Sequence, residues 1–267
     1  MASRAGFAGP RPRLFGHRGA AGVAPENTLV SFCRAWEAGV DVLELDVHAT
    51  ADGEVVVIHD ATVDRTTDGS GEVRSLTMRD LERLDAGFRF SPDGGRTFPY
   101  RGQGVAVPRL ADLLQELPDA PLNIEIKQEH PSIVREVVDL VRAARASIVL
   151  AAEHDAIMRE IREAAPDVPT SLSALEVATF VRALHAGDQP MLPAGAVALQ
   201  IPPRFGDVVL VNVETLEAAH AQGAEIHVWT INDPDEVREL VALGCDGIIS
   251  DFPDLVRAVV EEGRRRG

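Results

Sequence analysis

The chain has 267 residues, a formal net charge of −16 at pH 7 and 45% hydrophobic residues. This length allows a large buried core, but the acidic balance argues against nonspecific binding to nucleic acid or anionic membrane, which require basic patches. The two cysteines, Cys33 and Cys245, suit a reducing compartment and form no disulfide framework. Met1–Arg13 lacks the apolar core of a secretory signal, and no apolar run has the length of a membrane span. We therefore expect a soluble cytoplasmic protein.

The first predicted elements are a strand at Arg13–His17 and an amphipathic helix. Apolar residues recur at helical spacing over residues 29–36, directly after a Pro-Glu-Asn-Thr sequence. We expect Asn27 to cap the start of this helix and Gly39 to follow its end.

The next predicted strand, over residues 42–47, carries two carboxylates among aliphatic residues. Because side chains along a strand alternate in direction, Glu44 and Asp46 emerge on the same face. Their charges repel each other and resist burial, and a divalent cation that prefers oxygen ligands would relieve both costs. The alternative is an edge strand with a hydrated polar face. Asp52-Gly53 then predicts a hairpin turn into a strand at residues 54–58.

Residues 61–104 interrupt this regular pattern. They are rich in glycine, serine and threonine turns, and they contain one predicted short helix at residues 75–85. The segment has too little apolar periodicity to form a core alone. We therefore expect residues 1–267 to form a single domain in which residues 61–104 are a small insertion.

Strands and helices alternate through the rest of the chain. The further predicted strands are residues 121–127, 147–151, 168–171, 196–200, 208–211, 225–230 and 246–249. Such alternation favours a parallel α/β fold. The glycines at positions 16, 19 and 22 lack the spacing of a dinucleotide-binding open sheet. Polar residues instead recur at the C-terminal ends of strands, which a barrel gathers on one face. We predict a (β/α)8 TIM barrel with a small insertion after the second barrel strand.

Glu125 and Lys127 repeat the i, i+2 spacing of Glu44 and Asp46. In a barrel all four side chains face the same interior. A divalent cation, Mg²⁺ or Ca²⁺, held by Glu44, Asp46 and Glu125 would account for three clustered acids. Lys127 and Arg18 would offset the excess negative charge and attract a phosphate. The alternative is a salt-bridge network that neutralises itself.

Two histidines end predicted strands and can reach the same site. His17 and His59 have side chains that titrate near neutral pH, which suits an acid and a base for displacement at phosphorus. Asp60 could orient His59, although adjacent strand residues face opposite ways. His48 lies on the face of Asp46 and could be a metal ligand, but it precedes a turn and we expect a rim residue. Trp229 is expected to pack in the core or to form a pocket wall.

Ordered motifs make the sequence resemble the glycerophosphodiester phosphodiesterase family from about Leu14 to Val260. They are Gly16-His-Arg-Gly19, Pro25-Glu-Asn-Thr28, Glu44-Leu-Asp46, His59-Asp60, Asp64-Arg-Thr-Thr67, Val228-Trp-Thr-Ile-Asn232 and Gly244-Cys-Asp-Gly-Ile-Ile-Ser-Asp251. Each motif is short, but the ordered set is specific.

The resemblance implies a (β/α)8 barrel and a small-molecule glycerophosphodiester substrate that is split into glycerol 3-phosphate and an alcohol. In one route the 2-hydroxyl of the substrate's glycerol attacks phosphorus, and water opens the resulting cyclic phosphate. The roles that the family implies are divalent-metal ligands at Glu44, Asp46 and Glu125, acid and base at His17 and His59, and phosphate-binding cations at Arg18 and Lys127.

Two other functions remain open at this point. One is a binding protein that retains the phosphate site without hydrolysis, although the intact histidine pair argues against it. The other is a lysophospholipase D, or a related barrel phosphodiesterase or lyase, that acts on lipids. An exposed apolar rim would favour the lipid substrates, whereas the net charge of −16 and the aromatic content of 4% do not favour membrane docking.

Overall fold

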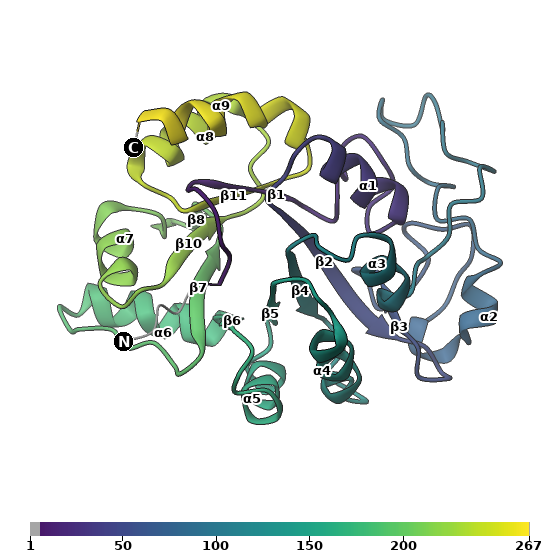
Figure 1. Ribbon diagram of the computed structural model, residues 1–267, viewed down its shortest axis with the longest axis horizontal. Helices are drawn as coiled ribbons and strands as arrows, with labels where there is room; N and C mark the ends of the chain where they lie inside the picture. The colour runs from purple at the N-terminus through teal and green to yellow at the C-terminus, as the bar shows by residue number, and fades with distance from the viewer. Residues whose placement is uncertain (1–5, 267) are drawn as a thin grey trace.

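Parallel strands form a closed ring in the computed structural model, which describes residues 6–266 (Figure 1). Among these residues eight strands pair side by side, and β1 pairs with both β11 and β2, which closes the barrel. The eight are β1 (Arg13–Gly16), β2 (Val42–Ala49), β4 (Leu122–Ile126), β5 (Ile148–Ala151), β6 (Thr170–Ser171), β7 (Ala196–Ile201), β10 (Glu225–Val228) and β11 (Gly247–Ser250). The predicted TIM barrel is confirmed. The sequence predicted no secretory signal over Met1–Arg13. Residues 1–5 of that segment lie outside the described residues.

Helices surround the barrel and lead from the end of one strand to the start of the next (Figure 1). They are α1 (Leu29–Glu37), α3 (Leu110–Glu116), α4 (Val134–Ala143), α5 (Asp155–Ala164), α6 (Ala174–His185), α7 (Val213–His220), α8 (Pro234–Leu243) and α9 (Pro253–Arg266). In α4 the valines at 134, 137, 138 and 141 form one buried stripe against the sheet. No described helix combines the length and apolar character that crossing a membrane requires.

The remaining strands lie outside the ring. β3 (Val55–Val57) pairs antiparallel with β2 after the predicted Asp52-Gly53 turn, where Gly53 has a φ of 84°. β8 (Arg204–Phe205) and β9 (Val208–Val209) form an exposed hairpin after β7. The short strand predicted over residues 208–211 is therefore present over its first two residues as β9, but it lies in this hairpin and not in the barrel. Pro202 and Pro203 lack the backbone N–H donors that would continue the hydrogen bonding of β7, so the barrel strand ends at Ile201.

Residues 61–104 contain a 3₁₀ turn, η1 (Val73–Ser75), and one short helix, α2 (Met78–Leu81). The helix predicted over residues 75–85 is shorter in the structure. A capping box of Thr77 and Asp80 begins it at Met78, and it ends at Leu81. A small apolar cluster lies beneath it, consisting of Val56, Ile58, Val63, Val73, Met78, Leu81, Ala86, Val105 and Val107. Because Val56 and Ile58 complete this cluster from the β3 side, we propose that the segment folds together with the barrel.

The N-terminal ends of the strands are closed by a buried ionic cluster. Arg13, only 3% exposed, donates from Nη1 to Glu225 at 2.6 Å, and His227 Nε2 lies 2.9 Å from the same carboxylate. Burial alone would raise the pKa of Glu225, but His227, Arg13 and Arg11 together lower it to about 2. His227 is therefore a structural residue at the closed end.

Replacing Glu225 with glutamine should reduce the free energy of unfolding at pH 7 by about 3 kcal/mol, because it leaves the charge of Arg13 buried without its partner. The folded pKa lies below the ordinary value of 4.5. The stabilisation is therefore present above that value and fades as the pH falls toward 2. Urea unfolding at pH 7 and pH 3 should show a larger loss at pH 7. Asp119→Asn, which removes only an exposed pair with Arg145, is the control. Equal losses at both pH values would contradict the assignment.

Candidate active site

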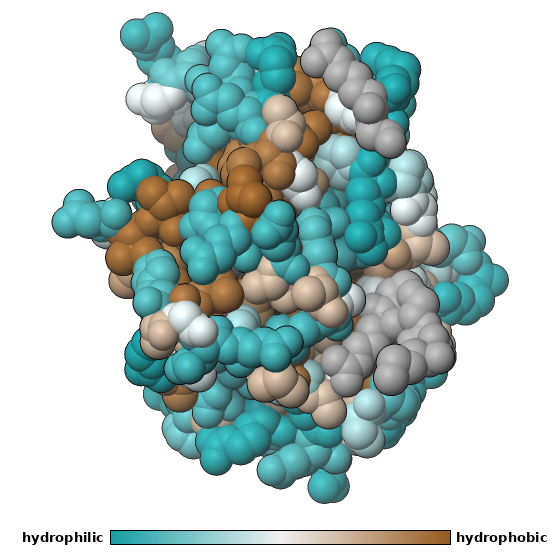
Figure 2. All heavy atoms as spheres, turned by 90° about the vertical axis from the view of Figure 1, so that its left-hand side faces the viewer, coloured by the Kyte–Doolittle hydropathy of each residue, from teal (hydrophilic) through white to brown (hydrophobic). Residues whose placement is uncertain are grey.

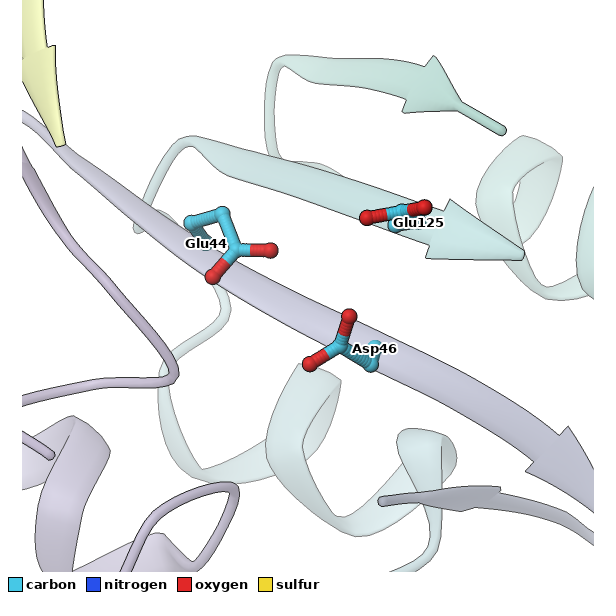
Figure 3. A group of neighbouring side chains, drawn as sticks. All are labelled: Glu44, Asp46 and Glu125. Atoms are coloured by element: carbon cyan, nitrogen blue, oxygen red, sulfur yellow. The ribbon is translucent and has the colours of Figure 1, made fainter. Parts of the chain in front are cut away.

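Three carboxylates meet at the C-terminal end of the barrel (Figure 3). Glu44 and Asp46 project from β2, and strand pairing places Glu125 of β4 beside Asp46. One oxygen from each side chain lies within 4.8 Å of the others. The i, i+2 spacing along β2 and the register between β2 and β4 therefore produce the acidic cluster that the sequence predicted.

The three carboxylates lie close enough for the charge of one to alter the pKa of the others. Burial and the neighbouring Asp46 raise the pKa of Glu44 to about 7. Burial also raises the pKa of Glu125, although Lys127 opposes it. For Asp46 the effect of burial is outweighed by Lys127, Arg18 and His59, which together hold its pKa below the ordinary value.

Two cations flank the acids. Lys127 Nζ lies 2.8 Å from Glu125 and 3.3 Å from Asp46. Arg18 donates from Nη1 to Glu26 at 2.9 Å, and its Nε lies 3.3 Å from Asp46. That Nε is buried and has no hydrogen-bond partner within residues 6–266. The guanidinium is therefore held beside Asp46 by an ion pair, and Arg18 lines the cavity, where it can bind an anionic ligand.

A strained turn positions Arg18 at the end of β1. Arg18 has a φ of 49°, in the left-handed region that disfavours residues other than glycine, and Gly19 follows with a φ of 86°. The Arg18 N–H donates to Glu44 at 2.9 Å, and its carbonyl accepts from the N–H of Asn27 at 3.0 Å. These two bonds offset a backbone strain on the order of 1–3 kcal/mol.

Asn27 supports the acidic cluster and does not cap α1, so the prediction of its capping role was wrong. The N-cap is Thr28, whose hydroxyl accepts from the N–H of Ser31. Asn27 has a φ of 56°, whereas an N-cap residue needs an extended backbone. Its amide donates to Asp46 Oδ2 at 3.0 Å, and its side-chain oxygen accepts from the N–H of Asp46. Gly39 follows the end of α1 with a φ of 80°, as predicted.

His17 is held by a carboxylate that sequence reasoning did not select. Its Nδ1 lies 2.7 Å from Asp251 Oδ1, while Asp251 Oδ2 accepts from the amide of Asn232 at 2.7 Å. Burial would lower the pKa of His17, but Asp251 and Glu44 outweigh burial and raise it. Asp251 and Asn232 both lie in the motifs that carry the family resemblance, and this was the available signal.

Replacing Asp251 with asparagine should lower the kcat of any reaction that uses His17 by about 10- to 100-fold, because a neutral amide does not stabilise the protonated imidazole and has only one oxygen to accept from both His17 and Asn232. Loss of the negative charge should also lower the pKa of His17, so the pH–rate limb that depends on it should move to lower pH. Steady-state rates across pH would test both effects. Asp254→Asn, an exposed change three residues along the chain, is the matched control. An unchanged profile in Asp251→Asn would contradict this role.

His59 has a similar carboxylate partner. Its Nδ1 lies 2.7 Å from Asp60 Oδ1, so the suggested orienting contact is present. The argument against it, that strand neighbours face opposite ways, does not apply because β3 ends at Val57. Arg65 donates to both Asp60 and Glu26, and it holds the pKa of Asp60 well below the ordinary value. His59 is therefore fixed by a network that extends toward Arg18.

Two other predicted site residues lie in different surroundings. His48 is buried, with 5% exposure, and not on the rim as predicted. Its Nε2 lies 3.1 Å from the carbonyl oxygen of His59, which can only accept, so His48 supports the backbone of that residue. Burial lowers the pKa of His48. Trp229 is 43% exposed and lines a cavity together with the acids, so it does not pack in the core.

A single cavity of about 700 Å³ joins these groups. All eight side chains predicted to form the site line it: His17, Arg18, Glu44, Asp46, His59, Glu125, Lys127 and Trp229. Acids, bases and cations at the C-terminal end of a parallel barrel are the arrangement expected of an active site. The groups present can bind an anion, hold a divalent cation and transfer protons.

Comparisons with known proteins point to one family. The model of the glycerophosphoryl diester phosphodiesterase family matches residues 17–255. The chain is 30% identical to a glycerophosphodiester phosphodiesterase of Caldanaerobacter subterraneus subsp. tengcongensis, over 94% of this chain and 98% of the relative. It is 27% identical to the lysophospholipase D of Mus musculus, over 90% and 83% of the two chains.

Solved structures give the same result. A glycerophosphodiester phosphodiesterase from Agrobacterium tumefaciens superposes with a TM-score of 0.74 at 30% identity, covering 92% of this chain and 99% of that one. A phosphodiesterase from Oleispira antarctica, solved with the product sn-glycerol-3-phosphate, gives a TM-score of 0.73 at 25% identity, with 94% and 97% covered.

Proposed function

Because the chain belongs to the glycerophosphoryl diester phosphodiesterase family, we propose that it hydrolyses glycerophosphodiesters to glycerol 3-phosphate and an alcohol. The observation that carries the proposal is the convergence, in one cavity, of two carboxylate-held imidazoles, two cations and an acidic cluster. The product found in the Oleispira relative supports this choice of substrate.

The acidic cluster fits a divalent cation. Two oxygens on opposite sides of one Ca²⁺ are roughly 5 Å apart, and about 4 Å apart around Mg²⁺, so a spread of 4.8 Å suits one shared ion. The three carboxylates with Arg18 and Lys127 carry a net charge of about −1 when ionised. A divalent cation at Glu44, Asp46 and Glu125 would make this +1, which matches an anionic phosphodiester. When bound, it would neutralise charge at phosphorus and lower the pKa of a coordinated hydroxyl.

Arg18 and Lys127 would bind the phosphate oxygens. Arg18 lines the cavity beside Asp46, and its guanidinium can form charge-assisted bonds to phosphate oxygens. The ammonium of Lys127 contacts Glu125 and Asp46, so it lies at the edge of the acidic cluster where a phosphate would bind. Together these cations hold the phosphodiester beside the imidazoles.

His17 and His59 would move the protons. In both rings a carboxylate engages Nδ1, which leaves Nε2 as the nitrogen that can face the substrate. One Nε2 removes the proton of the nucleophile, either the glycerol 2-hydroxyl of the substrate or water. The other donates a proton to the leaving alkoxide. Trp229 would form the wall against which the substrate packs.

The decisive test is release of glycerol 3-phosphate from a panel of glycerophosphodiesters that differ in the alcohol. Each reaction would contain Mg²⁺, Ca²⁺, Mn²⁺ or a chelator. We expect release that depends on the metal and stops with the chelator. Absence of release with every metal, from protein that unfolds cooperatively on heating, would overturn the proposed function.

A further inference from the structure

The arginine of the motif Asp64-Arg-Thr-Thr67 joins two parts of the candidate site, although the proposed reaction does not use it. Arg65 donates from Nη1 and Nη2 to Glu26 at 2.6 and 2.7 Å. It also donates from Nε and Nη2 to Asp60 at 2.7 and 3.0 Å. One guanidinium therefore binds two carboxylates bidentately, which fixes their orientation more firmly than a single-point ion pair would.

Each of these two carboxylates in turn holds a residue of the site. Glu26 Oε1 accepts from Arg18 Nη1 at 2.9 Å, and Asp60 Oδ1 lies 2.7 Å from His59 Nδ1. Arg18 also pairs with a carboxylate of the acidic cluster. The complete chain of contacts is Asp46, Arg18, Glu26, Arg65, Asp60 and His59. Acidic and basic side chains alternate along it, so no two neighbours repel each other.

The backbone around Arg65 is fixed by the insertion over residues 61–104. The N–H and the hydroxyl of Thr67 donate to the carbonyl of Val63 at 3.1 and 2.8 Å. Both residues are fully buried, and Val63 packs in the small apolar cluster described above. The turn that carries Arg65 is therefore held on both sides by buried residues, so the guanidinium starts from a fixed point.

The insertion reaches the site through charged side chains. It lies to the right in Figure 1, whereas Figure 2 shows the left-hand side, where brown apolar spheres gather. Arg65 is not among the described residues that line the cavity, and its side chain is 47% exposed. Any effect of Arg65 on the reaction must therefore pass through Glu26 and Asp60.

We propose that Arg65 is a positioning residue that fixes His59, which transfers a proton, relative to Arg18, which binds the phosphate. This inference rests on the proposed function, which assigns those two roles. Without the guanidinium, Glu26 and Asp60 would lose two hydrogen bonds each, and nothing would offset the repulsion between them. Both side chains are partly exposed and could turn toward solvent, which would leave the imidazole and the phosphate-binding guanidinium poorly oriented.

The first test replaces Arg65 with methionine, which has a similar length and no charge. For a small glycerophosphodiester we expect kcat to fall about tenfold and KM to rise about tenfold, the lower range for residues that orient active-site groups. Arg65→Lys keeps the charge but cannot bind two carboxylates bidentately, so it should restore only part of either constant. Arg74→Met, which removes a similarly exposed arginine of the insertion paired with Glu72, is the matched control.

Two double variants distinguish positioning from a general loss of structure. Arg65→Met should change kcat less than about twofold when Asp60 is already asparagine, because the path to His59 is already broken. It should likewise change KM less than about twofold when Glu26 is already glutamine. Calorimetric titration with glycerol 3-phosphate, which needs no turnover, should show about tenfold weaker binding to Arg65→Met. If Arg65→Met does not fold, Arg65→Lys serves in the same comparisons.

The outcomes separate this inference from the function on which it rests. If the unmodified protein hydrolyses glycerophosphodiesters and Arg65→Met changes neither constant, the arginine forms an ordinary surface ion pair and the inference is overturned. Equal losses in every background, or full activity of Arg65→Lys, would also overturn it. Absence of hydrolysis by the folded unmodified protein would overturn the proposed function itself, and the titration would then decide the link between Arg65 and Arg18.

Discussion

Replacing His17 with alanine is expected to lower kcat for glycerophosphodiester hydrolysis by about 10²- to 10⁴-fold, the usual contribution of a positioned acid or base. The imidazole is held by Asp251 and lies beside Glu44, with its Nε2 4.0 Å from that carboxylate. The phosphate-binding cations stay in place, so KM should change much less than kcat. Initial rates with a small glycerophosphodiester would measure both constants.

The matched control for this variant is His130→Ala, because His130 is an exposed histidine outside the cavity. Its kcat should equal that of the unmodified protein. Thermal unfolding of both variants would show that each is folded. If folded His17→Ala protein retained more than a tenth of the original kcat, an acid–base role for this residue would be excluded.

Glutamine in place of Glu44 is expected to abolish most of the stabilisation that a divalent cation gives. A cation at 100 times its Kd stabilises the folded protein by about 2.7 kcal/mol, which raises the melting temperature. Loss of one of three carboxylate ligands should shift that response to much higher metal concentration. Without metal the variant should be at least as stable as the original, because it removes a buried carboxylate whose pKa Asp46 and burial raise to about 7.

Calorimetric titration and thermal unfolding in Ca²⁺ and Mg²⁺ would measure both effects without relying on activity. Glu37→Gln, an exposed change on α1, should leave the response to metal intact. Two results together would contradict the metal site: millimolar cations that leave the melting temperature of the original protein unchanged, and a metal-free Glu44→Gln variant that is less stable. The acids would then form, with Arg18 and Lys127, a salt-bridge network that neutralises itself.

Local spacing in the sequence was sufficient to predict the barrel and the centre of the candidate site. Alternating strands and helices favour a parallel sheet, and polar residues at the strand ends favour a fold that gathers them on one face. The direction of Glu44 relative to Asp46, and of Glu125 relative to Lys127, follows from the two-residue period of a strand. This period is a property of the backbone and does not depend on what surrounds the strand. For that reason the acidic cluster could be located before its geometry was known.

The partners of these side chains were decided only by the tertiary structure. Asp251 lies 234 residues from His17 in sequence, and it reaches the imidazole because β11 pairs with β1 when the barrel closes. Asparagine favours both helix caps and left-handed turns, so its presence at position 27 was compatible with the predicted cap. Only its contact with Asp46 assigns it to the turn. The exposure of Phe205 likewise depends on a hairpin that pairs with itself outside the ring. Spacing along a strand determines where a side chain points, whereas its neighbours depend on which distant segments the closed barrel brings beside it.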